Sequence, residues 1–167
     1  VEEVFARRLD LIKPTRAQCA EVGRMYLNTV EPTAKETIKK LQDQGWECLI
    51  ISGGFEPCIA PLARELGIAR VEAVPLQFDV GGQYLGFDEN YPTTRSGGKP
   101  EIIRSIRAEI GPSKFVMVGD GASDLETDSE VDAFIGFFRY VRRNSVAQNC
   151  NAHAFSMSEI IETHLDF

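Results

Sequence analysis

Hydrophobic and polar positions follow two different periods along this chain. Over the first 45 residues the apolar positions recur at helical spacing, which predicts helices over residues 1–11, 15–26 and 33–44. Pro14 ends the first of these stretches, and Gly45 is a typical C-terminal signal for the third. The first part of the chain is therefore expected to be helical.

Further along, short apolar runs bounded by turn residues predict buried strands. Such runs occupy residues 47–52, 71–74 and 114–118 and are rich in branched side chains. Helical patterns over residues 56–67 and 100–111 lie between them. This alternation of strands and helices predicts an α/β fold with a mainly parallel sheet.

Residues 75–87 break this rhythm, because apolar and polar residues alternate there around Gly81 and Gly82. That pattern predicts a β-hairpin inserted between two helical stretches. Near the C-terminus, weaker strands over residues 133–135 and 153–155 are separated by a helix that includes residues 142–147. No internal repeat or flexible linker interrupts the pattern, so one domain with a small appendage is expected.

The composition narrows the classes of function. The chain has 167 residues, 43% of them hydrophobic and 26% charged, which is ordinary for a globular domain, and no apolar run is long enough to cross a bilayer. The formal net charge of −7 argues against a nucleic-acid partner. Arg139, Arg142 and Arg143 form one local basic cluster, which we interpret as a solvated helix face.

The four cysteines show neither CxxC nor another paired metal spacing. Free thiols in a reducing compartment are therefore expected, which indicates an intracellular protein. The cytoplasm is favoured. An organelle stays open, because the sequence begins with Val1 inside a predicted helix and the true N-terminus is not visible.

Candidate chemistry begins with two aspartates that follow the apolar run over residues 115–118. The segment reads FVMVGDGASDLE, so Asp120 stands at the carboxyl end of a strand and Asp124 in the first turn of the next helix. Carboxylates so placed are hard oxygen ligands of the kind that Mg²⁺ prefers. Taken alone, the same residues are equally typical of a turn and a helix cap.

Two other segments can contact an anion. Ser52, Gly53 and Gly54 lie where a strand gives way to a helix, so a hydroxyl and free backbone N–H groups can converge there. Lys99 begins a helix after a Ser-Gly-Gly sequence, where an ammonium can neutralise a phosphate. Each signal is weak by itself, because tight turns and solvated lysines are common.

The order of these segments resembles that of the haloacid dehalogenase superfamily. Three stretches, ISGGF, GFDENYPTTRSGGK and MVGDGASDLE, are similar to stretches of the phosphoserine phosphatase family and occur in the same order. The likeness runs from about Phe5 to the C-terminus. It implies a Rossmann-like core with a mainly parallel sheet, a β-hairpin insertion and a partial helical cap. Residues 1–30 would be a remnant of the cap and residues 31–167 the core.

The resemblance also implies roles for single residues. Catalytic roles would fall to Ser52, Lys99 and Asp124, with Asp124 holding a metal-bound water or orienting Lys99. Asp120 would ligate the Mg²⁺ cofactor. The substrate-binding residues would be Arg8, Ser52, Gly53, Gly54, Lys99 and Ser123. Arg8 matches the arginine that pairs with the substrate carboxylate, and its planar guanidinium suits that task.

One departure from the family is large. Its reaction begins with a DxDxT motif on the first strand, and no two aspartates of this sequence are two residues apart. The absent strand would lie between the strand ending at Ser52 and the strand ending at Asp120. We therefore expect the sequence to be the C-terminal part of a longer protein, and the chain alone to be inactive, because its nucleophile is missing.

The implied function is Mg²⁺-dependent hydrolysis of O-phospho-L-serine to L-serine and phosphate through an aspartyl-phosphate, the last step of serine biosynthesis. The expected partner is thus a small phosphorylated amino acid, with no nucleic acid and no membrane. A phosphatase acting on phosphoethanolamine or phosphocholine is one alternative. A catalytically inactive phosphate-binding fragment or relative is another, and the sequence leaves the oligomeric state open.

Overall fold

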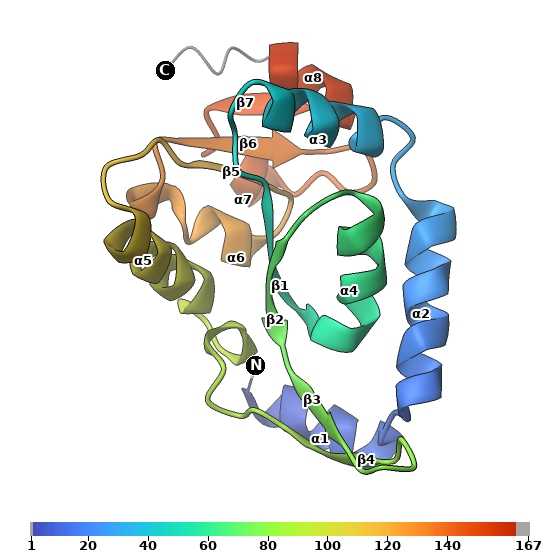
Figure 1. The fold of residues 1–167 in the computed structure, drawn as a ribbon. Coiled ribbons are helices and arrows are strands. Elements are labelled where there is room, and N and C mark those ends of the chain that lie inside the picture. The colour runs from blue at the N-terminus through green and yellow to red at the C-terminus, as the bar shows by residue number, and fades with distance from the viewer. Residues whose placement is uncertain (1, 163–167) are drawn as a thin grey trace.

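The computed structural model describes residues 2–162, with side chains for residues 6–161 (Figure 1). The α-helices are α1 (Glu2–Ile12), α2 (Arg16–Thr29), α3 (Ala34–Asp43), α4 (Glu56–Glu65), α5 (Gly98–Ile110), α6 (Ala122–Leu125), α7 (Asn144–Ala147) and α8 (Met157–Glu162). The strands are β1 (Leu49–Phe55), β2 (Arg70–Val74), β3 (Leu76–Phe78), β4 (Tyr84–Phe87), β5 (Val116–Gly119), β6 (Ala133–Phe137) and β7 (Ala152–Ala154). Two 3₁₀ turns are η1 (Pro92–Thr94) and η2 (Asp128–Glu130).

The strands confirm the predicted α/β class and the predicted hairpin. β1 pairs in parallel with β2, β5 to β7 form a second parallel group in the order β5-β6-β7, and β3 pairs antiparallel with β4. The sequence predicted one mainly parallel sheet, whereas the structure holds two separate parallel groups. Among the described residues no strand hydrogen bonds to the free edges of β1 and β5.

Some predicted boundaries were wrong by one to three residues. The strand predicted over residues 47–52 is β1 and extends to Phe55, because Phe55 still pairs with Val74 beyond the two glycines. The helix predicted to include residues 142–147 starts at Asn144, so the two arginines before it belong to a loop. The last strand lies one residue earlier than predicted.

The junction between α1 and α2 is set by local interactions. Lys13 takes a φ of +43°, a left-handed conformation that turns the chain after α1 (Figure 1). Thr15 then caps α2, since its hydroxyl accepts the Gln18 N–H at 3.2 Å while its own N–H donates to Gln18 Oε1 at 2.8 Å. The two helices therefore meet at a short, well-defined turn.

α2 is fixed against the rest of the protein at two places. Figure 1 shows it along the outer side of α4, and a Cβ on Gly23 would lie 2.8 Å from the Pro61 ring, so only glycine permits this approach. At its start, the Arg16 N–H donates to the Gly82 carbonyl at 2.9 Å. The Arg16 guanidinium also lies 5.2 Å from the centre of the Phe78 ring. The hairpin and α4 together hold α2 in place.

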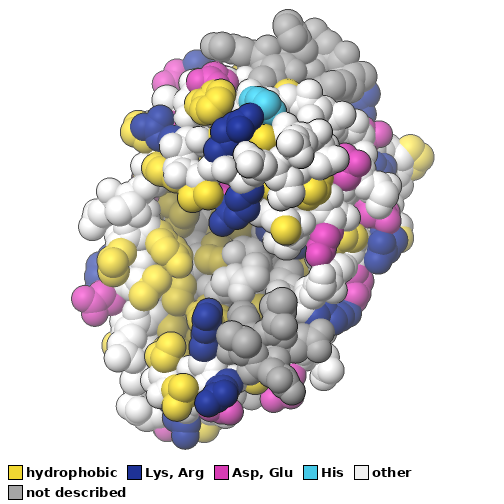
Figure 2. Space-filling view, turned by 180° about the vertical axis from the view of Figure 1, so that it is seen from behind, with side chains coloured by type: hydrophobic (Ala, Val, Ile, Leu, Met, Phe, Trp, Pro, Cys, Tyr) yellow, Lys and Arg dark blue, Asp and Glu magenta, His cyan; other side chains and the backbone are white. Residues whose placement is uncertain are grey.

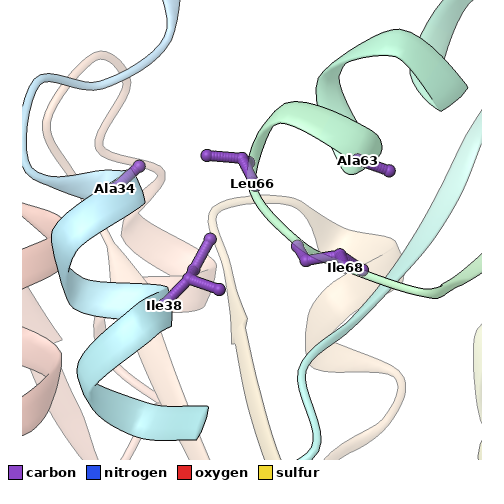
Figure 3. Packing of buried hydrophobic residues seen from close by; sticks show 5 residues of the cluster. All are labelled: Ala34, Ile38, Ala63, Leu66 and Ile68. Carbon is purple, nitrogen blue, oxygen red and sulfur yellow. The ribbon is translucent and has the colours of Figure 1, made fainter. Parts of the chain in front are cut away.

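Three apolar clusters stabilise the parallel groups within the described residues, and one of them, formed by Ile135, Ala154 and Ile160, joins α8 to β6 and β7. The second joins α3 to α4 and to the turn that follows α4 (Figure 3); its buried members are Ala34, Ile38, Ala63, Leu66 and Ile68. The third packs α7 against β6 through Phe134, Phe138 and Val146. Burying each of the larger side chains contributes about 1.5–3 kcal/mol. No helix within residues 2–162 has the length and hydropathy needed to cross a membrane.

The start of β5 is tied down by Asp132, and this contact predicts a pH effect. Asp132 Oδ2 accepts the Phe115 N–H at 2.7 Å and an Arg107 N–H at 2.8 Å. The Phe115 hydrogen bond and then the Arg107 guanidinium lower the pKa of Asp132. The stability from this carboxylate is thus fully present above its unfolded pKa of about 3.9 and is lost as pH falls through its folded pKa.

We expect Asp132→Asn to lower the urea midpoint at pH 7, because the charge that the two donors favour is removed. The difference from the unmodified chain should narrow as the pH falls below about 4, because the Asp132 carboxylate of the unfolded chain then binds a proton while that of the folded chain is still ionised. Asp43→Asn is a matched control, since the Lys39 partner of Asp43 is exposed. A difference that stays constant between pH 7 and pH 3.5 would contradict this reasoning.

Candidate active site

Asp120 and Asp124 lie at the carboxyl end of β5, in the strand, turn and helix that the sequence predicted. Asp124 is buried at the start of α6, and its Oδ2 accepts the Gly121 N–H at 2.8 Å. A Cβ on Gly119 would lie 2.3 Å from that same oxygen, so residue 119 must be glycine for the carboxylate to fit. The glycines at positions 119 and 121 therefore fix where the Asp124 carboxylate can lie.

Lys99 and Asp124 form a buried ion pair. Lys99 Nζ lies 2.5 Å from Asp124 Oδ1, and the two side chains are only 14% and 10% exposed. Because both charges have largely left water, each depends on the other for its compensation. The fold thus brings Lys99 and Asp124 into contact although they are 25 positions apart in the sequence.

The Ser52 segment reaches the Lys99 segment through the loop that contains η1. A Cβ on Gly98 would lie 1.8 Å from the Pro92 carbonyl oxygen, so the start of α5 packs directly on this loop. The next residue of the loop, Thr93, places its carbonyl oxygen 3.4 Å from the Cβ position of Gly53. The Ser52 hydroxyl accepts the Gly54 N–H at 3.0 Å. Ser52, Gly53, Gly54 and Lys99 thus belong to one packed unit.

A cavity of about 1060 Å³ separates the edges of β1 and β5. Its walls are mostly apolar, and the strand residues that line it include Leu49, Ile50, Ile51, Val116, Met117 and Val118. Lys99, Asp120 and Asp124 border the same cavity. Figure 2 shows a hollowed face of the molecule on which hydrophobic side chains gather. The cavity is therefore bordered both by the charged side chains and by the free edges of β1 and β5.

Arg143 is a residue of this site that the sequence interpretation missed. Its guanidinium contacts the Asp120 carboxylate and also donates to the Asp120 carbonyl oxygen at 3.0 Å. The three arginines of the predicted basic cluster are exposed as expected, but they lie in the loop before α7 and not on a helix face. Arg139 lies 3.6 Å from buried Glu31, and the Arg142 guanidinium lies 5.7 Å from the Phe138 ring. The position of these arginines just after β6, at the sheet edge that also carries Asp120, was the available signal.

The donor set suits Mg²⁺ only in part. Asp120 offers a carboxylate that is 44% exposed, whereas Asp124 is already committed to Lys99 and the Gly121 N–H. Within residues 2–162 no three His, Cys, Asp or Glu side chains are grouped closely enough to hold a metal. Since Mg²⁺ is usually bound by one or two protein carboxylates with substrate phosphate and water, Asp120 can be one such ligand.

The two remaining predicted residues stand apart from this unit. Arg8 is exposed on α1, and no ion pair joins it to a residue within 6–161, where side chains are described. Ser123 is exposed in α6, one residue before Asp124. Their predicted contacts with substrate carboxylate and phosphate, like the division at residue 30 between cap and core, stay predictions.

Comparison with known proteins agrees with this arrangement. A family model for haloacid dehalogenase-like hydrolases matches residues 2–127. A phosphoserine phosphohydrolase-like protein from Francisella tularensis has the same fold, with a TM-score of 0.85 and 22% identity over 98% of this chain and 77% of that one. The chain therefore belongs to the haloacid dehalogenase-like hydrolase family.

Curated relatives narrow the class further. Mouse phosphoserine phosphatase is 35% identical over 162 residues, which are 96% of this chain and 72% of the mouse protein. The Drosophila melanogaster protein of the same name is 38% identical over 96% of this chain and 60% of its own length. Within its family, the chain is therefore related to phosphoserine phosphatases, which are phosphomonoesterases, and this confirms the resemblance found in the sequence.

Proposed function

We propose that these residues form part of the active site of a Mg²⁺-dependent phosphatase that hydrolyses O-phospho-L-serine to L-serine and phosphate. The observation that carries the proposal is the buried Lys99–Asp124 pair beside the Ser52 segment. An ammonium shielded from water next to a hydroxyl and glycine amides is well suited to a phosphoryl group. Hydrolysis of phosphoserine would be the last step of serine biosynthesis.

In this proposal each side chain has one task. Asp124 orients the Lys99 side chain before substrate binds, and Lys99 then turns its ammonium towards the phosphoryl oxygens. Ser52, with the amides of Gly53 and Gly54, binds the same group, and Ser123 contacts it from α6. Asp120 would hold Mg²⁺, and the ion would supply positive charge to neutralise the phosphate. Arg143 orients the Asp120 carboxylate through its contact with it.

The nucleophile would come from a parallel strand seated between β1 and β5. The apolar walls of the cavity and the free edges on both sides suit a short hydrophobic strand. An aspartate at the carboxyl end of that strand would lie near Lys99 and Asp120. It would accept the phosphoryl group as an aspartyl-phosphate, which water then cleaves.

Phosphoserine is the favoured substrate because Arg8 can pair with its carboxylate. Phosphoethanolamine and phosphocholine carry no carboxylate, so Arg8 would gain nothing from them. A catalytically inactive phosphate-binding protein is the alternative outside the enzymes, since no aspartate pair of the DxDxT type occurs in the sequence. The absence of paired cysteine spacing favours a reducing compartment, either the cytoplasm or an organelle. The Arabidopsis thaliana relative is named chloroplastic.

Phosphate release from phosphoserine with Mg²⁺ tests the proposal directly. We would assay the 167-residue chain alone and the same chain joined behind the N-terminal segment of the mouse relative, here named the completed chain. Turnover by the completed chain only is the expected result. Turnover by the chain alone would remove the need for an added nucleophile. No turnover by either protein would favour the inactive alternative.

Arg8→Ala in the completed chain tests the choice of substrate. We expect the KM for phosphoserine to rise about 30-fold or more, because a charge-assisted contact contributes about 2 kcal/mol or more. Activity on phosphoethanolamine should stay unchanged. Arg7→Ala is the matched control, since Arg7 is also exposed on α1. An unchanged KM for phosphoserine would remove the reason for naming this substrate.

A further inference from the structure

The start of α5, which carries Lys99, is not capped by a side chain of its own N-cap residue. Gly97 occupies the N-cap position at a φ of +75°, and neither it nor any neighbour on its own helix supplies a side-chain cap. The first N–H groups of a helix need outside partners. The partner here comes from a different segment, the end of α6.

That partner is Glu126. Its Oε2 accepts the Gly97 N–H at 2.8 Å, and its Oε1 accepts the Ser96 hydroxyl at 2.6 Å. A carboxylate at this position also suits the positive end of the α5 dipole. Both oxygens of one side chain are therefore used to hold the two residues that lead into α5.

Glu126 and Asp124, two residues apart in the sequence, both contact the start of α5. Asp124 contacts the Lys99 side chain, while Glu126 contacts the backbone and Ser96 two to three residues before it. The Asp124 contact must weaken whenever the Lys99 ammonium turns towards a phosphoryl group. The Glu126 contacts involve no group that meets the ligand, so they persist through that change.

We propose that Glu126 is a positioning residue that keeps the start of α5, and with it Lys99, in place while Lys99 transfers from Asp124 to the substrate phosphate. The inference rests on the proposed function for its catalytic consequence. Its structural part, the hold of Glu126 on Ser96 and Gly97, stands on the contacts alone.

Amide hydrogen exchange on the 167-residue chain tests the structural part without any activity. In Glu126→Ala the Gly97 and Lys99 amides should exchange about tenfold faster, while the amides of β5 stay unchanged. Glu126→Gln should recover most of the protection, because its amide oxygen can accept the Gly97 N–H and its NH₂ can donate to Ser96. Unchanged exchange in Glu126→Ala would overturn the inference.

Kinetics of the completed chain test the catalytic part. Glu126→Ala should lower kcat for phosphoserine about tenfold and leave KM within about twofold. Lys99 can still bind the substrate phosphate in this variant, but its ammonium is less well placed for the transition state. Glu126→Gln should restore kcat. Glu130→Ala is the matched control: Glu130 also holds α5, through Arg104 at 2.8 Å, but more than a turn beyond Lys99.

The two experiments separate the possible failures. A completed chain without phosphatase activity refutes the proposed function, and exchange at Gly97 still decides whether Glu126 holds the start of α5. Equal losses of kcat in Glu126→Ala and Glu130→Ala would show a general effect on α5 and overturn the positioning role.

Discussion

Lys99→Met is expected to destabilise the protein by about 3 kcal/mol, because it leaves the Asp124 carboxylate buried without its cation. Methionine keeps much of the length and volume of lysine, so the loss reports charge rather than packing. Combining it with Asp124→Asn should recover most of the stability, since asparagine can still accept the Gly121 N–H through its carbonyl oxygen. Urea unfolding of the two single variants and the double variant measures the coupling between the residues.

The exposed Lys39–Asp43 pair supplies the control for this cycle. Its side chains are 70% and 62% exposed at a separation of 2.7 Å, so Lys39→Met should change stability by less than about 0.5 kcal/mol. Simple addition of the two single losses in the Lys99 and Asp124 double variant would contradict the interpretation as a coupled buried pair. In the completed chain, Lys99→Met should also abolish phosphate release.

Gly98→Ala is expected to cost about 3 kcal/mol through a purely steric effect. The added Cβ would lie 1.8 Å from the Pro92 carbonyl oxygen and 2.3 Å from its carbon, and both are backbone atoms that cannot rotate away. The start of α5 must therefore shift, which also moves Lys99. Thermal or urea unfolding measures the cost, and the Lys99 amide exchange rate reports the shift.

Gly97→Ala separates this clash from backbone strain. Gly97 has a φ of +75° but nothing within 4 Å of its Cβ position, so alanine there should cost only about 1 kcal/mol. Equal losses at positions 97 and 98 would show that conformational strain, and not contact with Pro92, dominates at this loop.

Local features of the fold could be predicted from the sequence because their causes are local. Thr15 and Gln18 lie three residues apart, and their reciprocal hydrogen bonds define the start of α2 whatever surrounds them. The Gly81–Gly82 hairpin likewise follows from its own turn. Asp120 and Asp124 were identified for the same reason, since one short segment contains the strand end, the turn and the helix start.

The contacts that complete the site were not predictable in this way. Arg143 meets Asp120 across 23 residues, and Glu126 meets Gly97 across 29, so nothing near either residue in the sequence indicates its partner. The two glycines after Ser52 resembled the end of a strand. Tertiary pairing of Phe55 with Val74 overrides that local signal and extends β1 past them.

Because α2 is held in place, the turn at Lys13 affects the length of substrate that the site can accept under the proposed function. The hairpin and α4 both hold α2 in place. The helix that carries Arg8, α1, is joined to α2 only by the short turn at Lys13. This turn fixes the distance between the Arg8 guanidinium and the Ser52 segment, which under the proposed function binds the phosphate. Under the proposed function, substrates would then be selected by length as well as by charge, and a homologue of phosphoserine with one more methylene would fit the span poorly.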